Sequence, residues 1–145
     1  LEEDEDDQEL PATEREASDA KPGETVLVVE DDQVVRGLVV ELLTELGYQV
    51  IDASDGQGGI AILNSPQRLD LLITDIGLPD VNGRDVASAG RLARPELKVL
   101  FMTAYAERAT QASGFLEHGM GLITKPFEMT QLAHRVQEII TAPHP

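Results

Sequence analysis

The sequence predicts an α/β domain built around a parallel β-sheet. After residue 24, five short strand-like segments alternate with helical segments. Runs such as residues 26–29 (VLVV) are apolar without alternation, which is typical of strands covered on both faces. Repeated strand–helix units with short connections form parallel sheets with right-handed crossovers. The chain has 145 residues, which suits one such domain.

The first half of the domain contains two predicted strand–helix pairs. A strand is predicted at residues 25–29, where a mostly β-branched run stops at an acidic triplet. Apolar residues then recur at helical spacing over residues 34–46, and a glycine ends this helix. A strand follows at residues 48–53 and a helix at residues 55–63, where three glycines each cost about 1 kcal/mol relative to alanine.

The second half continues the alternation. The strand-like run at residues 69–74 stops at Asp75, and Pro95 ends the helical segment at residues 84–93. Ser113-Gly114 interrupts the helical segment at residues 106–116. In chain order we predict a strand at residues 69–74, a helix at 84–93, a strand at 97–103, a helix at 106–116, a strand at 121–124 and a helix at 128–140.

The net charge of −16 is concentrated at the start of the chain. Residues 1–24 contain 11 acidic and 2 basic residues. They have few apolar side chains whose burial could offset the conformational entropy lost on folding. We interpret residues 1–24 as a disordered acidic linker, because blocks of like charge are usually solvated. The alternative is a specific acidic docking motif.

The composition excludes several classes of function. The chain has no cysteine, and therefore no disulfide, thiolate nucleophile or cysteine-ligated metal. A pI near 4.3 argues against binding to nucleic acid or to an anionic membrane, since both require clustered Lys and Arg. Apolar runs reach four residues, whereas a membrane-spanning helix needs about 20. We expect a cytoplasmic protein that is a monomer or weak dimer.

Polar side chains gather where the predicted strands end. The acidic triplet at residues 30–32 follows the first strand and Asp75 follows the third, while Thr103 ends the fourth and Lys125 follows the fifth. In an open α/β sheet the ligand site lies at the carboxyl ends of the strands. We therefore expect carboxylates, a hydroxyl and an ammonium group to converge on one edge of the sheet.

This set of groups suits phosphoryl transfer. Clustered carboxylates repel one another, and Mg²⁺ relieves the repulsion by binding carboxylates together with water and phosphate oxygens. An aspartate beside Mg²⁺ can attack a phosphoryl group, whose oxygens Lys125 and Thr103 would then stabilise. Each residue alone has a plainer interpretation: Asp75 suits a loop or cap, and Asp31-Asp32 suits a helix cap, which we prefer for Asp32.

Four stretches together resemble the receiver domain of response regulators in two-component signalling. They are residues 26–32 (VLVVEDD), 74–83 (TDIGLPDVNG), 102–104 (MTA) and 124–127 (TKPF). The resemblance extends from Thr25 to about Thr141. It implies a flavodoxin-like (βα)5 three-layer sandwich with strand order 2-1-3-4-5, and a receiver domain at residues 25–142.

The resemblance also implies roles for single residues. Asp75 matches the phospho-acceptor, Thr103 the switch hydroxyl, and Lys125 the phosphate-binding lysine, whose bond to Pro126 is cis in such domains. Leu122 stands where many receivers carry an aromatic residue, so the aromatic half of the usual switch is missing. The implied Mg²⁺ ligands are Asp31, Glu30 (often through water), Asp75 and the backbone carbonyl of Gly77.

The resemblance implies a function in signal relay. Asp75 would take a phosphoryl group from a phosphohistidine of a histidine kinase or phosphotransfer domain, and phosphorylation would shift the domain between two conformations. Self-dephosphorylation is expected, but no independent substrate turnover. The loop and lysine motifs are most similar to receivers at the C-terminus of hybrid sensor histidine kinases. We favour that context, the cytoplasmic end of a membrane-anchored kinase, over a free-standing regulator.

Two alternatives belong to other functional classes. One is a receiver-like interaction module that works without phosphorylation, which the complete set of acids, hydroxyl and lysine disfavours. The other is a flavodoxin-like cofactor binder. This requires a phosphate-binding loop after the first strand, where residues 30–32 would repel a phosphate that lacks a metal.

Overall fold

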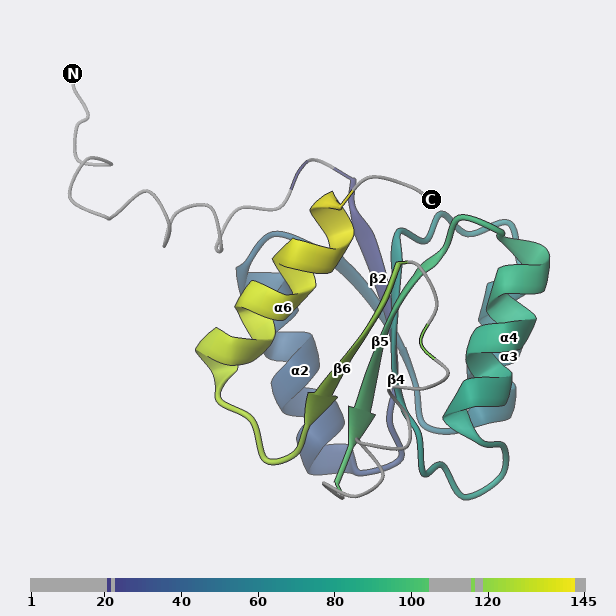
Figure 1. Cartoon of the computed structure of the whole chain (residues 1–145), viewed down its shortest axis with the longest axis horizontal. Helices are drawn as coiled ribbons and strands as arrows, with labels where there is room; N and C mark the ends of the chain where they lie inside the picture. The colour runs from purple at the N-terminus through teal and green to yellow at the C-terminus, as the bar shows by residue number, and fades with distance from the viewer. Residues whose placement is uncertain (1–20, 22, 105–115, 117–118, 143–145) are drawn as a thin grey trace, which may run out of the picture.

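A computed structural model describes residues 21, 23–104, 116 and 119–142, and its centre is a five-stranded parallel sheet (Figure 1). The strand order is β3-β2-β4-β5-β6, so the first strand of the chain lies between the second and the third. This confirms the predicted flavodoxin-like order 2-1-3-4-5. The strands are β2 Thr25–Val29, β3 Gln49–Ala53, β4 Leu71–Asp75, β5 Lys98–Thr103 and β6 Met120–Thr124.

Four helices in the described part of the chain cover the two faces of the sheet. Helices α2 and α6 lie on one face and α3 and α4 on the other, which gives three layers (Figure 1). No helix among these residues has the length and apolar character needed to cross a membrane. The helices are α2 Gln33–Glu45, α3 Gly56–Leu63, α4 Gly83–Ala93 and α6 Met129–Thr141.

The core consists of one apolar layer on each side of the sheet. On β2, Val26 and Val28 belong to the cluster beneath α2 and α6, while Leu27 and Val29 belong to the cluster beneath α3 and α4. All four side chains are fully buried. Both faces of this strand are therefore covered, which explains why its sequence is apolar without alternation.

The third strand differs most from its predicted bounds. The sequence predicts residues 69–74, whereas β4 runs over Leu71–Asp75 and pairs Asp75 with Met102 of β5. Asp70, which the prediction placed inside the strand, lies in the turn before β4. Its carboxylate accepts the N–H of Thr25 (2.8 Å) and pairs with Arg68 (3.1 Å).

Two predictions fall largely on residues that the structure does not describe. One is the acidic segment 1–24, of which residues 21, 23 and 24 are described. The other is the helix at residues 106–116, of which Leu116 is described.

Helix α3 forms despite its three glycines. A Cβ at Gly59 would lie 2.7 Å from Cγ2 of Val29, so the absence of a side chain lets the helix lie close to β2. Asp55 caps the helix, because its Oδ1 accepts the N–H of Gly58 (2.7 Å). Close packing and capping thus offset the low helix propensity of this segment.

Removal of a buried leucine from α6 should destabilise the domain. Leu132 is fully buried against the sheet, so we expect Leu132→Ala to lower the free energy of unfolding by about 2–5 kcal/mol. Leu92→Ala is the matched control: Leu92 is 87% exposed, and its truncation should change the value by less than about 0.5 kcal/mol. Urea denaturation measures both variants, and equal losses would contradict the packing described above.

Candidate functional site

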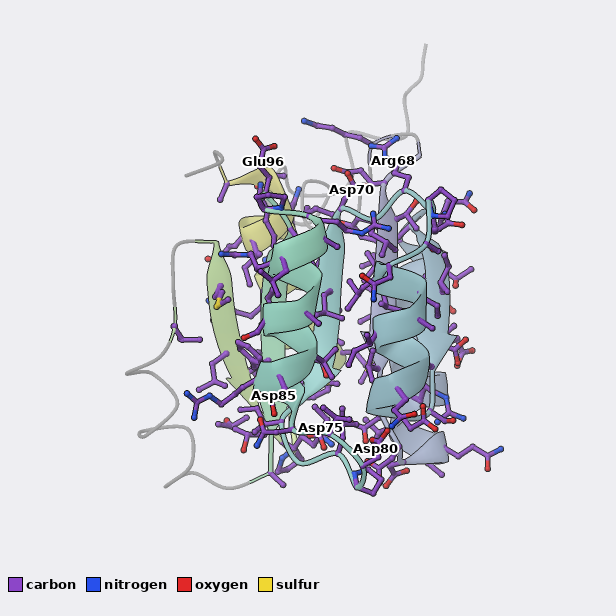
Figure 2. The ribbon with its side chains drawn as sticks, turned by 90° about the vertical axis from the view of Figure 1, so that its right-hand side faces the viewer. Arg68, Asp70, Asp75, Asp80, Asp85 and Glu96 are labelled. Carbon is purple, nitrogen blue, oxygen red and sulfur yellow. The ribbon has the colours of Figure 1, made fainter. Side chains whose placement is uncertain are left out.

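The residues singled out from the sequence lie at the carboxyl ends of neighbouring strands. Asp75 is the last residue of β4 and Thr103 the last residue of β5. Glu30 directly follows β2, and Lys125 directly follows β6. Figure 2 shows Asp75 at this end of the sheet, far from Asp70 at the other end.

Backbone hydrogen bonds hold the residues that follow the strands. The N–H of Glu30 donates to the last carbonyl of β3 (3.1 Å), and the N–H of Lys125 donates to the last carbonyl of β5 (2.7 Å). Ile76, the residue after Asp75, is held in the same way, since its N–H donates to the carbonyl of Met102 (2.9 Å). The sheet therefore fixes the backbone of the site.

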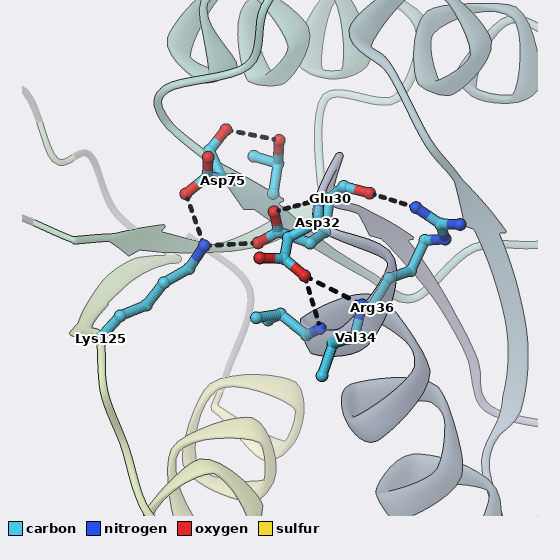
Figure 3. A network of polar contacts seen from close by, with 8 residues as sticks. Glu30, Asp32, Val34, Arg36, Asp75 and Lys125 are labelled. Carbon is cyan, nitrogen blue, oxygen red and sulfur yellow. Dashed lines mark hydrogen bonds and ion pairs between the residues drawn. The ribbon is translucent and has the colours of Figure 1, made fainter.

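The ammonium group of Lys125 lies between two carboxylates (Figure 3). Its Nζ is 2.6 Å from Oε1 of Glu30 and 3.2 Å from Oδ1 of Asp75. The side chain of Glu30 is 1% exposed, that of Asp75 10% and that of Lys125 19%. Two nearly buried acids thus share one cation, which offsets part of their repulsion and part of their desolvation cost.

Burial and neighbouring charges change the pKa values of Glu30 and Lys125. Burial raises the pKa of the Glu30 carboxyl, the hydrogen bond from Lys125 counteracts only part of that effect, and the charge of Asp75 adds to the increase. Burial acts to lower the pKa of the Lys125 ammonium group, but the bond to Glu30 and the charge of Asp75 outweigh it, so this pKa is raised. The lysine therefore stays charged at neutral pH.

A third carboxylate, that of the exposed Asp31, completes an acidic cluster. Ligand oxygens of Glu30, Asp31 and Asp75, one from each, all lie within 4.8 Å of one another. One lysine charge does not balance three acids, and carboxylate oxygens are the ligands that Mg²⁺ prefers, so the donor set fits this ion. Gly77, the fourth expected ligand, is exposed in the loop after β4.

Asp32 caps helix α2. Its Oδ1 accepts the N–H groups of Val34 (2.9 Å) and Val35 (3.2 Å), which confirms the capping interpretation. Oε2 of Glu30 accepts the N–H of Asp32 (3.0 Å), so the cap is linked to the acidic cluster (Figure 3). The start of α2 and the strand end that precedes it are thereby held together.

Thr103, the expected switch residue, and Leu122, which stands where many receivers carry an aromatic residue, lie on the neighbouring strands β5 and β6. Thr103 is 2% exposed and lies opposite Thr124 in the pairing of β5 with β6. Leu122 of β6 is half-buried and packs against the cluster beneath α3 and α4. The Lys125–Pro126 bond is cis, as the resemblance implies.

Arg36 supports the site from α2, a role that the sequence does not predict. Its guanidinium donates to the backbone carbonyl of Glu30 (2.8 Å) and pairs with Asp52 of β3 (3.1 Å). Figure 3 shows Arg36 reaching from the helix toward Glu30. Arginines on helices usually lie in solvent, and no local pattern in the sequence marks Arg36 as a partner of Glu30.

An apolar groove opens beside the acidic cluster. It lies between the first half of α2 and the segment that joins β6 to α6, and it includes Lys125 and Ala104. A partner that brings a reacting group to Asp75 would therefore meet apolar surface next to the charged site. Six of the lining residues are Val35, Leu38, Val39, Pro126, Phe127 and Met129.

Comparison with known proteins identifies the family. Residues 26–137 match the model of the response regulator receiver domain. A probable transcriptional regulatory protein of Picosynechococcus sp. is 34% identical over 121 residues, which cover 79% of this chain and 48% of that protein. The sensor kinase CckA of Brucella abortus is 31% identical over 125 residues, which cover 86% of this chain and 13% of the kinase. The chain spans about half or less of the length of these relatives.

A solved structure supports the same assignment. The response regulator protein TrrA of Thermotoga maritima, in complex with Mg²⁺ and BeF, superposes with a TM-score of 0.70 at 27% identity and covers 80% of this chain and 98% of that chain. The family match includes the whole acidic cluster and all of the five strands except Thr25. The chain therefore belongs to the response regulator receiver domain family of two-component signalling.

Proposed function

We propose that residues 25–142 form a phospho-accepting receiver domain that relays a signal through Asp75. The observation that carries this proposal is the position of Lys125, whose Nζ lies 2.6 Å from Glu30 and 3.2 Å from Asp75. It sets a nucleophilic carboxylate beside a fixed positive charge and beside oxygen ligands for a cation. Phosphoryl transfer depends mainly on positioning and electrostatic stabilisation of this kind.

In the proposed reaction, a carboxylate oxygen of Asp75 attacks the phosphorus atom of a phosphohistidine. An O–P bond forms as the N–P bond breaks, and the imidazole nitrogen keeps the electron pair and takes up a proton. Lys125 would stabilise the charge on one phosphoryl oxygen, and the hydroxyl of Thr103 would donate to another. Attack of water on the aspartyl phosphate would release phosphate and restore Asp75, which is the expected self-dephosphorylation.

Glu30, Asp31, Asp75 and the carbonyl of Gly77 would hold Mg²⁺. When bound, the ion supplies positive charge to the carboxylates and to the phosphoryl oxygens. Both oxygens of Glu30 already accept hydrogen bonds, from Lys125 and from the N–H of Asp32. We therefore expect Glu30 to contact Mg²⁺ through a water molecule and the exposed Asp31 to contact the ion directly.

Phosphorylation would shift the population between two conformations of the domain. Thr103 would move toward the phosphoryl group and change the packing at the end of β5. Leu122 on the neighbouring strand has no ring to reorient, so the change would be transmitted through aliphatic packing against the cluster beneath α3 and α4.

We propose a histidine kinase or a histidine phosphotransfer domain as the phosphoryl donor. The apolar groove beside the acidic cluster offers such a partner a docking surface, and likeness to the sensor kinase CckA favours a place in a hybrid kinase. On this proposal residues 1–24 are an acidic linker. The domain is cytoplasmic, a monomer or weak dimer, and binds neither nucleic acid nor membrane.

Incubation with Mg²⁺ and acetyl phosphate should add one phosphoryl group to the protein. Asp75→Ala should abolish the addition because the acceptor oxygen is lost, and chelation of Mg²⁺ should abolish it because the acids lose their counter-charge. Asp85→Ala, which removes an exposed acid at the same end of the sheet, should leave it unchanged (Figure 2). Intact-mass spectrometry measures the addition. An unmodified wild-type protein, or a modified Asp75→Ala protein, would sink the proposal.

A charge placed in the apolar groove should impair transfer from a protein donor but not from a small one. Leu38 lines the groove and is 48% exposed. We expect Leu38→Asp to slow transfer from a histidine phosphotransfer domain about tenfold, because the charge must be desolvated on docking. Acetyl phosphate should react at the wild-type rate. Leu92→Asp is the control, because Leu92 lies on α4 and is 87% exposed. Equal rates of transfer from the protein donor to the two variants would exclude the groove as its docking surface.

A further inference from the structure

The loop that carries Gly77 is tied to the start of helix α3 by Asp80. Oδ1 of Asp80 accepts the N–H of Gly56 (2.9 Å), and Oδ2 accepts the N–H of Gln57 (3.0 Å). Asp80 belongs to the loop between β4 and α4, whereas the two amides open a helix that comes earlier in the chain. Figure 2 shows Asp80 and Asp75 at the same end of the sheet.

This carboxylate completes the N-terminal cap of α3. The first N–H groups of a helix have no partner within the helix. Asp55 accepts the N–H of Gly58, and Asp80 accepts those of Gly56 and Gln57. The two amides also lower the pKa of the Asp80 carboxyl, because they bond to its charged form. A glycine-rich helix of low intrinsic propensity thus depends on a side chain from the acceptor loop.

Steric contact brings the loop against the helix independently of these hydrogen bonds. A Cβ at position 56 would lie 2.8 Å from Cβ of Val81 and 3.3 Å from Oδ1 of Asp80. A side chain at Gly56 would therefore shift the loop. The loop and the helix are fitted to each other at this point.

The two ends of the loop are fixed at the acceptor. The N–H of Gly83 donates to the carbonyl of Ile76 (2.9 Å), and a Cβ at Gly83 would lie 2.2 Å from the carbonyl oxygen of Asp75. Between these ends, Asp80 joins the loop to α3, and Gly77 lies three residues before it. The position of the Gly77 backbone therefore depends on the bonds that Asp80 makes.

We infer that Asp80 is a positioning residue for the metal site, because it sets the place of the Gly77 carbonyl through its bonds to the start of α3. The inference rests on the proposed function, in which that carbonyl is a Mg²⁺ ligand. Coupling between two sites is reciprocal. Mg²⁺ bound at the acceptor site should therefore stabilise the first turn of α3.

Asp80→Ala should weaken Mg²⁺ binding and loosen the start of α3 together. We expect the dissociation constant for Mg²⁺, measured by calorimetry, to rise about tenfold, which is typical when a residue that orients a ligand is lost. Hydrogen exchange at the amides of Gly56 and Gln57 should become faster even without metal. Mg²⁺ should slow this exchange in the wild type and not in the variant. Asp85→Ala removes the same charge from the first turn of α4 and is the control.

Gly56→Ala separates positioning from simple stabilisation of α3. Alanine raises helix propensity, but its Cβ would push the loop away, so we expect weaker Mg²⁺ binding without loss of the helix. Gly58→Ala is the matched control. It raises propensity equally, and its Cβ would approach Asp55 and Ala53 rather than the loop.

The possible outcomes distinguish this inference from the proposed function. Weaker Mg²⁺ binding in both Asp80→Ala and Gly56→Ala, with wild-type binding in the two controls, supports the inference. Wild-type affinity in either test variant overturns it and leaves the proposed function intact. A wild-type protein that binds no Mg²⁺ overturns both. If Asp80→Ala fails to fold, Gly56→Ala alone decides.

Discussion

The charge bridge at the carboxyl edge of the sheet is the interaction on which the rest of the site depends. Parallel strands bring Glu30 and Asp75 to this edge, where both are nearly buried. Lys125 comes from the end of β6, and β5 lies between that strand and the acid-bearing β4. The long lysine side chain reaches across β5 and thereby connects the ends of β6, β4 and β2. Its positive charge offsets part of the repulsion between the clustered carboxylates and part of the cost of burying them.

The helices support this edge from both faces of the sheet. On one face, the start of α2 contributes Asp32, which is bonded to Glu30, and Arg36, which donates to the Glu30 carbonyl. On the other face, the loop between β4 and α4 is bonded to the start of α3 through Asp80. The start of α2 is therefore bonded to the acidic cluster itself, and the start of α3 is bonded to the loop that follows Asp75.

Much of the fold and of the acidic cluster could be predicted from the sequence because the signals are local. Apolar runs without alternation indicate strands covered on both faces, and acids directly after such runs must lie at the carboxyl edge. Asp32 was predicted as a cap from its place before a helical pattern, and its bonds to Val34 and Val35 confirm this. The place of Lys125 after the last strand predicted that it would lie near the acids, but its ion pair with Glu30 was not predicted.

The remaining features depend on contacts between distant parts of the chain. The glycines of α3 predict a weak helix, but Gly59 is fitted against Val29 and Gly56 against Val81, neither of which is near in sequence. Arg36 has the appearance of a solvent-facing residue until the position of Glu30 is known. The role of Asp70 in the turn before β4 likewise depends on Thr25. A single sequence holds no local signal for such pairs.

The charge bridge is tested most directly by a double-mutant cycle on Glu30 and Lys125 in metal-free protein. The two groups are 2.6 Å apart and Glu30 is almost wholly buried, so Lys125→Met leaves the Glu30 charge without its cation, while Glu30→Gln leaves Lys125 paired with Asp75 alone. From urea denaturation, we expect Glu30→Gln combined with Lys125→Met to be about 1–3 kcal/mol more stable than the sum of the two single changes predicts. Additive losses would contradict a bridge that holds the acidic cluster together.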